Sequence, residues 1–360
     1  MKKLRFRLED KTRMFVNYLD YYSFKLFHPF TKKLPEINKI IVIELKYIGD
    51  IIVTTPVYST LKRKFPNAKI DVAVPSGMED VLYGNKNINK IVIMDINNPK
   101  LDENYDLAVI LHNGTKKICK LLKEKAKYRI GCTRVGILEP KGYYLNRKTK
   151  PAKWQHKVFD NLDVLKTINI NAENPKLELH VNTNARKSIN EKLKKYKVSS
   201  KDKIIIIHAA PQHKTHQWLP ERFVELSDSL SKKYRVIFTG AEKDKPIIED
   251  IFSRMHNKAI NLAGFTTVSE LIALIERADL IISVDTGAMH ISAALNKPTI
   301  ALFGAGDPLI WHPFSENSKV IYKDEVCTSC MKHKCSNKVQ MECMKYITVK
   351  DVLEAIHHSL

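Results

Sequence analysis

A run of apolar, β-branched residues ending in Asp-Thr-Gly constrains the fold of this 360-residue chain more than any other feature. Leu280–Val284 indicates a buried strand, and Gly287–Leu295 indicates a helix that begins directly after the turn at Asp285 and Thr286. The first turn of such a helix carries unpaired N–H groups and the positive end of the helix dipole, which favour a phosphate group. The turn therefore predicts an enzyme or binding protein for a phosphorylated ligand.

A second turn of the same kind lies near the other end of the chain. Ile40–Leu45 indicates a buried strand, Lys46–Asp50 the turn, and the helix is expected to run from Ile51 through Leu61. Gly49 gives the turn backbone freedom. Asp50 would then lie at the carboxyl edge of the sheet, where open α/β sheets bind their ligands. The alternative is that Asp50 only caps the helix, because Asp is a good N-cap.

Each turn belongs to its own run of alternating strands and helices, which indicates parallel sheets covered on both faces. The polar segment 168–203, with a helical piece near Ala185–Tyr196, separates the runs. The expected fold is α/β, with two Rossmann-like domains that face each other across a cleft. The other expected strands are Lys69–Val74, Lys90–Asp95, Asp106–His112, Lys203–His208, Tyr234–Gly240 and Thr299–Gly304, and the expected helices of the second run are Pro220–Leu230, Pro246–Met255 and Val268–Ala278.

Several motifs resemble one family. Leu45–Val57 resembles the N-terminal motif of the family 9 glycosyltransferases, the ADP-heptose:lipopolysaccharide heptosyltransferases, and is most similar to their heptosyltransferase III branch. Asp285–His290 resembles their C-terminal donor motif. Further similar segments follow in the family's order at Trp218–Phe223, Phe238–Gly240, Pro298 and Phe303–Pro308. The resemblance covers residue 39 to the C-terminus and implies a GT-B fold, with the acceptor in the N-terminal domain and the nucleotide sugar in the C-terminal domain.

The resemblance implies an inverting transfer of heptose from ADP-heptose to a lipopolysaccharide inner-core acceptor, with no cofactor for catalysis. An inverting transfer needs a base for the acceptor hydroxyl and stabilisation of the departing diphosphate. Asp50 matches the family's base, and Lys46 and Gly49 lie beside it on the acceptor side.

The donor motif supplies the second half of the expected site. Thr286 and Gly287 would offer N–H donors to the diphosphate, and His290, one helical turn further, would face the same cleft. A histidine packed in the helix is the alternative for His290. Asp285 would hold the turn or a ligand hydroxyl, because its charge repels phosphate.

The chain departs from the family where many members carry a phosphate-binding Lys two residues before the Trp of the Trp-Pro-type segment. His216 occupies that position, so either His216 or Lys214 would contact the phosphate. Glu242, or alternatively Asp244, matches a position near the nucleoside, and Thr266 falls in the segment that flanks the adenine in the family.

Two other enzyme functions and one non-enzymatic function are compatible with the same motifs. A GT-B nucleotide-sugar epimerase would turn over a nucleotide sugar without an acceptor, and a glycosyltransferase could use another donor sugar. A nucleotide- or nucleic-acid-binding module would bind without turnover, and nucleic-acid binding would depend steeply on salt. The net charge is +21, with Lys+Arg 60 against Asp+Glu 39, but no nucleic-acid-reading motif is present and nucleic acid is not expected as a partner.

The expected domain boundaries follow from these patterns. They are an N-terminal arm over 1–38, an acceptor domain over 39–180, a linker over 181–202, a donor domain over 203–346 and a C-terminal helix over 347–360. The arm up to Lys33 holds nine Lys/Arg against three acids, and its aromatic and leucine residues recur three or four positions apart. This stripe comprises Phe15, Tyr18, Leu19, Tyr22 and Leu26.

A basic amphipathic helix of this kind is typical of a segment that lies on an anionic membrane. Docking of the arm on the enzyme itself, or on a second subunit, is the alternative. No signal peptide or spanning segment is expected, so the protein is predicted to be cytoplasmic and peripheral to the inner membrane.

Four of the six cysteines form a C-x2-C-x4-C-x7-C array with His333 inside it. In a reducing compartment metal ligation by such an array competes well with disulfide formation. Four thiolates suit a structural zinc or iron ion. Four reduced thiols in a compact loop are the alternative. A metal here would be structural, because the array lies outside both turn motifs along the chain. The array comprises Cys327, Cys330, Cys335 and Cys343.

Overall fold

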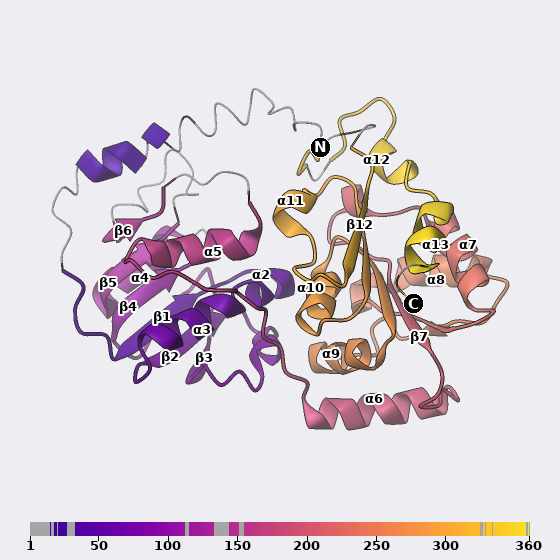
Figure 1. Ribbon diagram of the computed structural model, residues 1–360, viewed down its shortest axis with the longest axis horizontal. Helices are drawn as coiled ribbons and strands as arrows, with labels where there is room; N and C mark the ends of the chain where they lie inside the picture. Colours follow the sequence, from indigo (N-terminus) through magenta and orange to yellow (C-terminus); the bar gives the residue numbers. More distant parts are fainter. Residues whose placement is uncertain are drawn as a thin grey trace. The chain divides into compact units, whose positions relative to one another are not determined.

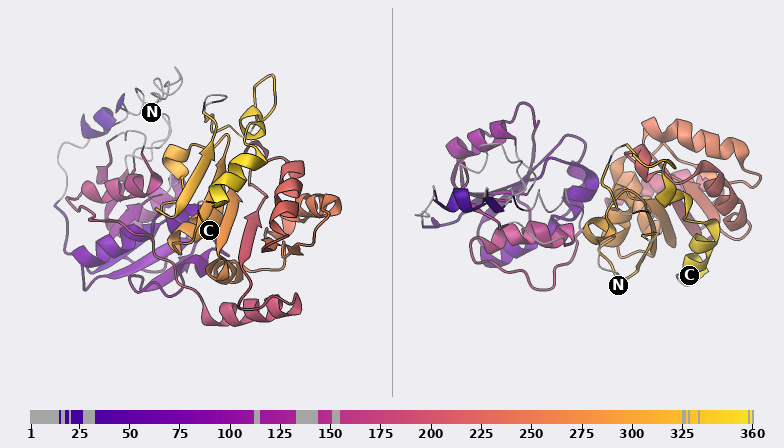
Figure 2. Two further views of the ribbon diagram at one scale, coloured as in Figure 1. Left: turned by 45° about the vertical axis from the view of Figure 1, so that its right-hand side comes forward. Right: turned by 90° about the horizontal axis from the view of Figure 1, so that it is seen from above.

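A computed structural model describes residues 15, 18–19, 21–26, 33–111, 115–132, 144–150, 155–324, 327, 329–332, 334–357 and 359. The chain divides into two compact units. Unit 1 comprises Met1–Glu79 and Asn85–Lys176, and unit 2 comprises Asp80–Gly84 and Leu177–Leu360. In each unit a parallel sheet lies between helices (Figures 1 and 2). The α/β fold expected from the sequence is therefore confirmed.

The sheet of unit 1 has the strand order β3-β2-β1-β4-β5-β6. β1 pairs in parallel with β2 and with β4, so the order reverses beside β1. Its central strands are fully buried because helices cover both of their faces. The elements are β1 Lys39–Ile43, α2 Ile48–Ile52, α3 Thr55–Lys64, β2 Lys69–Val74, β3 Lys90–Ile93, β4 Tyr105–Ile110, α4 Lys116–Lys125, β5 Ala126–Gly131, β6 Arg147–Lys148 and α5 Lys157–Lys166.

The sheet of unit 2 repeats this topology in the order β12-β11-β10-β7-β8-β9. Its reversal lies between β7 and β10. The elements are α6 Thr183–Lys195, β7 Ile204–His208, η3 Lys214–His216, α7 Pro220–Leu230, β8 Arg235–Phe238, η4 Glu242–Asp244, α8 Lys245–Arg254, β9 Ile260–Asn261, α9 Val268–Arg277, β10 Leu280–Val284, α10 Gly287–Ala294, β11 Thr299–Phe303, α11 Pro308–Trp311, β12 Ser318–Tyr322, α12 Glu342–Lys345 and α13 Val349–His357. A short 3-10 helix, η1 Glu79–Leu82, spans the boundary between the units.

The prediction of one helix from Ile51 through Leu61 was wrong. The structure has two helices, α2 and α3, with a break at Val53 and Thr54. Pro56 occupies the first turn of α3, where its missing N–H costs nothing, and it could not continue a helix that began earlier. The interruption places Asp50 inside the short helix α2 instead of in the turn before it.

The segment expected as a linker contains a helix that belongs to unit 2. α6 lies along α9, where Arg186 pairs with Glu276, and Lys192 pairs with Glu270 at 2.7 Å. Ser188 donates a further hydrogen bond to Glu270. These contacts fix the helix to its own unit.

The described part of the N-terminal arm is helical over residues 21–26, and it separates its side chains into two faces. Tyr21 and Phe24 are buried, and Phe24 joins the core of unit 1 with Lys148 5.7 Å from its ring centre. The predicted stripe is exposed instead, with exposed fractions between 38% for Tyr18 and 75% for Leu26. The arm thus packs on unit 1 through residues outside the stripe, and most of the other arm residues lie outside the described ones.

Candidate functional site

The residues singled out by the two turns lie at the reversal points of the two sheets. Glu44 and Asp50 follow β1, beside which the order of the first sheet reverses. His208 ends β7 and Asp285 follows β10, which are the two strands at the reversal of the second sheet. Ligands of open α/β sheets bind at the carboxyl ends of the strands where the strand order reverses. Each unit therefore presents polar side chains at the position that its topology reserves for a ligand.

The candidate site in unit 1 contains a buried pair of carboxyl groups, Glu44 and Asp50. Glu44 is 1% exposed and Asp50 is 8% exposed. Burial, and then the charge of Asp50, raise the pKa of Glu44 to about 8. Burial also raises the pKa of Asp50, although Lys46, Lys157 and the backbone N–H of Tyr47 act in the opposite direction. The two buried carboxyl groups titrate as a coupled pair, and the charge of Asp50 favours the protonated form of Glu44.

Two lysines face this pair from different elements. Lys46 belongs to the β1–α2 loop, and Lys157 begins α5, which His156 caps by accepting a bond from the N–H of Val158. The hydroxyl of Tyr58 in α3 contacts Thr54 Oγ1 at 2.6 Å. The sequence pointed to Asp50, Gly49 and Lys46 but missed Glu44 and Lys157. A carboxylate at the end of an apolar strand was a usable signal for Glu44, whereas nothing along the chain links Lys157 to Asp50.

In unit 2 the structure brings His216 and Asp285 together. His216 Nδ1 lies 3.0 Å from Asp285 Oδ2, and both side chains are largely buried. Gly306 approaches them so closely that a Cβ there would lie 2.1 Å from the same carboxylate oxygen. Asp285 therefore lies between a side chain from η3 and the backbone of the β11–α11 loop.

The remaining residues of the donor motif surround this pair. Thr286 is the N-cap residue of α10, and its hydroxyl lies 3.0 Å from Ser283 Oγ. Gly287 begins the helix, as the sequence indicated. His290 is 3% exposed, and its ring meets Trp311 edge-on with 6.1 Å between the ring centres. In this structure His290 packs inside unit 2.

A second group of predicted residues gathers at the α8 end of unit 2. Glu242 pairs with Lys245 at 2.6 Å, and Lys245 lies 4.6 Å from the ring centre of Phe265. Gly264, at φ +74°, places its backbone against both charged side chains. Thr266 follows the exposed ring of Phe265. Sequence analysis missed Lys245 and Phe265.

Two further polar residues lie near these groups. Lys214 is exposed in η3, two residues before His216. Burial lowers the pKa of His208 to about 4, and its Nδ1 lies 2.9 Å from Thr239 Oγ1. His208 is therefore neutral at physiological pH, and it adds no positive charge to the end of β7.

The four clustered cysteines lie close together in unit 2. Burial, and then the charges of the other three thiols, raise the pKa of Cys343 to about 11. Cys327 accepts a hydrogen bond from Asn337 Nδ2 at 3.3 Å, and Cys335 accepts one from the N–H of Met341 at 3.4 Å. Within the described residues, which omit His333, no three His, Cys, Asp or Glu side chains are arranged as metal ligands. The thiols are thus gathered without forming a ligand set.

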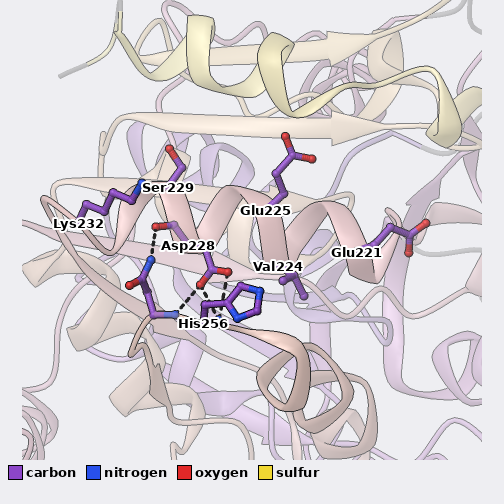
Figure 3. Close-up of a pocket in the computed structure, with 8 residues that line it drawn as sticks. Glu221, Val224, Glu225, Asp228, Ser229, Lys232 and His256 are labelled. Carbon is purple, nitrogen blue, oxygen red and sulfur yellow. Dashed lines mark hydrogen bonds between the residues drawn. The ribbon is translucent and has the colours of Figure 1, made fainter.

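An open groove of about 500 Å³ on α7 involves none of these residues. Figure 3 shows Glu221, Glu225, Asp228 and Lys232 along the helix, with His256 beside them. Asp228 accepts hydrogen bonds from the backbone N–H groups of His256 and Asn257. The carboxylate therefore fixes the loop after α8, and the groove shares no residue with the polar groups at the sheet reversals.

The fold and the two reversal sites define a two-unit enzyme of the GT-B class. The chain belongs to glycosyltransferase family 9 (heptosyltransferase), whose model matches residues 99–340, more than half of the chain. Lipopolysaccharide heptosyltransferase 3 of Escherichia coli (strain K12) is 29% identical over 296 residues, which cover 76% of this chain and 84% of that relative. The family and the branch that the motif Leu45–Val57 resembles are thereby confirmed, and the protein is a glycosyltransferase.

Solved structures agree with the fold. The glycosyl transferase family 9 protein from Veillonella parvula has a TM-score of 0.77 at 20% identity, covering 91% of this chain and 98% of that chain. E. coli ADP-heptose lps heptosyltransferase II has a TM-score of 0.72 at 23% identity, covering 89% of this chain and 98% of that chain. These similarities confirm the GT-B fold.

Proposed function

We propose that this chain transfers a heptosyl group from ADP-heptose to a lipopolysaccharide inner-core acceptor with inversion at the anomeric carbon. The relatives' names support this reaction, since they describe lipopolysaccharide heptosyltransferases and an ADP-heptose donor. The observation that carries the proposal is the buried Asp50 at the reversal point of the first sheet, flanked by Lys46 and Lys157.

In the proposed reaction Asp50 accepts the proton of the acceptor hydroxyl. The hydroxyl oxygen bonds to the anomeric carbon from the face opposite the nucleotide, and the bond between that carbon and the diphosphate oxygen breaks. ADP leaves with the electron pair of the broken bond. Glu44 keeps its proton, so the pair carries one negative charge and Asp50 is its ionised member.

The donor half of the proposal lies in unit 2. The N–H groups at Thr286 and Gly287 would bind the diphosphate, with Lys214 or His216 as the nearby cation. Asp285 holds His216 in place. Glu242 and Thr266 would lie on the nucleoside side. No step of the reaction requires a metal ion.

Incubation with a panel of nucleotide sugars and delipidated core acceptors tests the assignment through release of nucleoside diphosphate. Release of ADP is expected only when ADP-heptose and an acceptor are both present. Turnover of the donor in the absence of acceptor would favour the epimerase, and binding without any turnover would favour a binding module.

Replacing Gly306 by Ala is expected to weaken ADP binding about tenfold or more. The added Cβ would meet Asp285 Oδ2 at 2.1 Å and His216 Cε1 at 3.2 Å, so one of the two partners has to move. Titration calorimetry with ADP measures the effect, which corresponds to about 1.4 kcal/mol for each factor of ten. Gly77→Ala is the control: at φ +81° an Ala is strained although nothing lies near the added Cβ, so the change costs stability in unit 1 without touching a donor residue. Equal ADP affinities for the two variants would exclude this donor site.

We also propose that the exposed stripe of the arm binds an anionic membrane surface. Tyr22 and Leu26 are 62% and 75% exposed, while Phe24 of the same helix packs in the core of unit 1. The excess of basic residues in the first 33 positions complements anionic headgroups. No helix in the described part of the chain is long and apolar enough to cross a membrane.

The triple variant Leu19→Ser, Tyr22→Ser, Leu26→Ser is expected to bind vesicles containing phosphatidylglycerol at least tenfold more weakly, because each apolar side chain contributes to insertion. Cosedimentation measures binding. The control replaces three exposed apolar residues elsewhere, Tyr83, Ile93 and Val320, by Ser. Equal vesicle binding by both variants would exclude the stripe as the membrane-binding surface. If the stripe variant instead lost a dimer in the absence of lipid, the stripe would bind a second copy of the chain.

We propose further that the four thiols bind one zinc or iron ion per chain under reducing conditions. Their mutual proximity and the N–H donors to two of the sulfurs support a thiolate site. Replacing Cys327 and Cys330 together by Ser is expected to remove the metal and lower the melting temperature, since thiolate ligation couples metal binding to folding. Elemental analysis of untagged protein measures the metal. A content near zero, with thiols that react in the folded protein, would show four ordinary reduced thiols.

A further inference from the structure

The Cys-rich segment, here residues 329–332 and 334–343, is hydrogen-bonded to both loops of the proposed donor site. Thr215 Oγ1 donates to the carbonyl of Lys332 at 2.9 Å, and the N–H of Met331 donates to the carbonyl of Ala305 at 2.8 Å. Thr215 directly precedes His216, and Ala305 directly precedes Gly306. The segment is distant from the donor motifs along the chain, yet it contacts the two loops that hold Asp285.

The far end of the segment supports the second of these loops from behind. Gly304 lies against α12, where a Cβ would meet Met344 Sδ at 2.4 Å and Cys343 Sγ at 3.2 Å. Cys343 and Met344 are buried in the core that β10 and β11 share. The backbone that follows β11 is therefore held at two points: Gly304 packs against Cys343, and Gly306 packs against Asp285.

The donor of this bond, Thr215, is buried, whereas its acceptor is the carbonyl of the exposed Lys332. Thr215 is 4% exposed, although its neighbour Lys214 is exposed. Loss of the hydroxyl removes this bond and leaves the carbonyl to water. Thr215 thus links the position of η3, and of His216 within it, to the Cys-rich segment.

We propose that the Cys-rich segment is a brace for the donor site, and that Thr215 is a positioning residue that holds His216 against Asp285. The proposal rests on the proposed donor site. It predicts that changes confined to the segment alter donor affinity although no residue of the segment contacts the donor. Sequence position alone assigned the Cys-rich array a structural role outside the site. The proposal adds that the segment also supports the donor-binding residues.

Replacing Thr215 by Val, which keeps the shape but removes the hydroxyl, is expected to weaken ADP binding about fivefold or more and to raise the KM for the nucleotide sugar more than it lowers kcat. Thr215→Ser, which keeps the hydroxyl, is expected to bind within twofold of the wild type. Thr299→Val is a control for general destabilisation. The hydroxyl of Thr299 makes a buried hydrogen bond of 2.6 Å with Ser292, and neither residue belongs to the two loops. This control should lower the melting temperature without changing ADP affinity.

A second measurement perturbs the segment itself. In a Cys119→Ala, Cys132→Ala background from which a chelator has removed any bound metal, iodoacetamide alkylates the half-buried thiols of the cluster, with the modified positions counted by mass spectrometry. Alkylation is expected to weaken ADP binding, and to do so less in the Thr215→Val protein, because the two changes break one connection.

The outcomes separate two failures. Equal ADP affinity for Thr215→Val and Thr215→Ser, or unchanged affinity in protein alkylated at Cys330 or Cys335, would overturn the brace. Absence of ADP binding in the wild-type protein would instead overturn the proposed donor site.

Discussion

Replacing Asp50 by Asn is expected to lower kcat by about 10²–10⁴-fold, the usual contribution of a positioned base. The amide has the shape of the carboxylate but cannot accept the acceptor's proton. Because burial raises the pKa of Asp50, its charge destabilises the fold, and the variant should melt at the same temperature or higher. ADP affinity should be unchanged, since the proposed donor residues belong to unit 2.

Asp71→Asn is the matched control for this substitution. Asp71 is also fully buried in unit 1, but it accepts hydrogen bonds from Asn89 and Tyr105 within the framework of the sheet. That variant should lose stability and keep its kcat. Wild-type turnover in Asp50→Asn would assign Asp50 to the support of α2 alone, through its hydrogen bond with the N–H of Tyr47.

Stability is expected to fall as the pH rises from about 6.5 to 8, above the range in which the buried neutral His208 has the opposite effect, and Glu44→Gln should remove most of this fall. The pKa of Glu44 is about 8 in the folded protein and near its ordinary value of 4.5 when unfolded. Folding therefore binds a proton between these values. The contribution is fully present below the unfolded pKa and is lost as the pH passes through the folded one. The difference amounts to roughly 3–5 kcal/mol at pH 8.

Chemical denaturation of both proteins at several pH values measures this effect. The charged groups that act on Glu44 are Asp50, Lys46 and Lys157, and all of them remain in the variant. Glu276→Gln is the control: its carboxylate pairs with Arg186 at the surface and should change stability by less than about 1 kcal/mol. Parallel stability curves for the wild type and Glu44→Gln would contradict the assignment of the proton to Glu44.

The central strands could be predicted from sequence because helices cover both of their faces. Such strands are continuous apolar runs, as in Ile40–Ile43 and Leu280–Val284, and these runs have few alternatives. Strands β5, β6, β9 and β12 were missed, because they are short or carry charged residues. β6 is only Arg147–Lys148, and β12 begins with the polar pair Ser318 and Lys319.

Some residues of the candidate site could likewise be predicted from local sequence, and others could not. Asp50 and Asp285 follow apolar strands directly, so local sequence places them at the carboxyl edge of a sheet. The contacts of Lys157 with the carboxyl pair, of Gly306 with Asp285 and of Thr215 with Lys332 join residues far apart in the chain. Such contacts depend on how helices and loops pack, which no local pattern encodes.

The stoichiometry of one reaction tests the central claim most directly. Purified protein is incubated with ADP-heptose and a delipidated core acceptor, and ADP release is measured together with the mass of the acceptor. Heptosyl transfer predicts one ADP released for each acceptor that gains one heptose, and no release without acceptor. ADP release that leaves the acceptor mass unchanged, or a donor altered in the absence of acceptor, would contradict it.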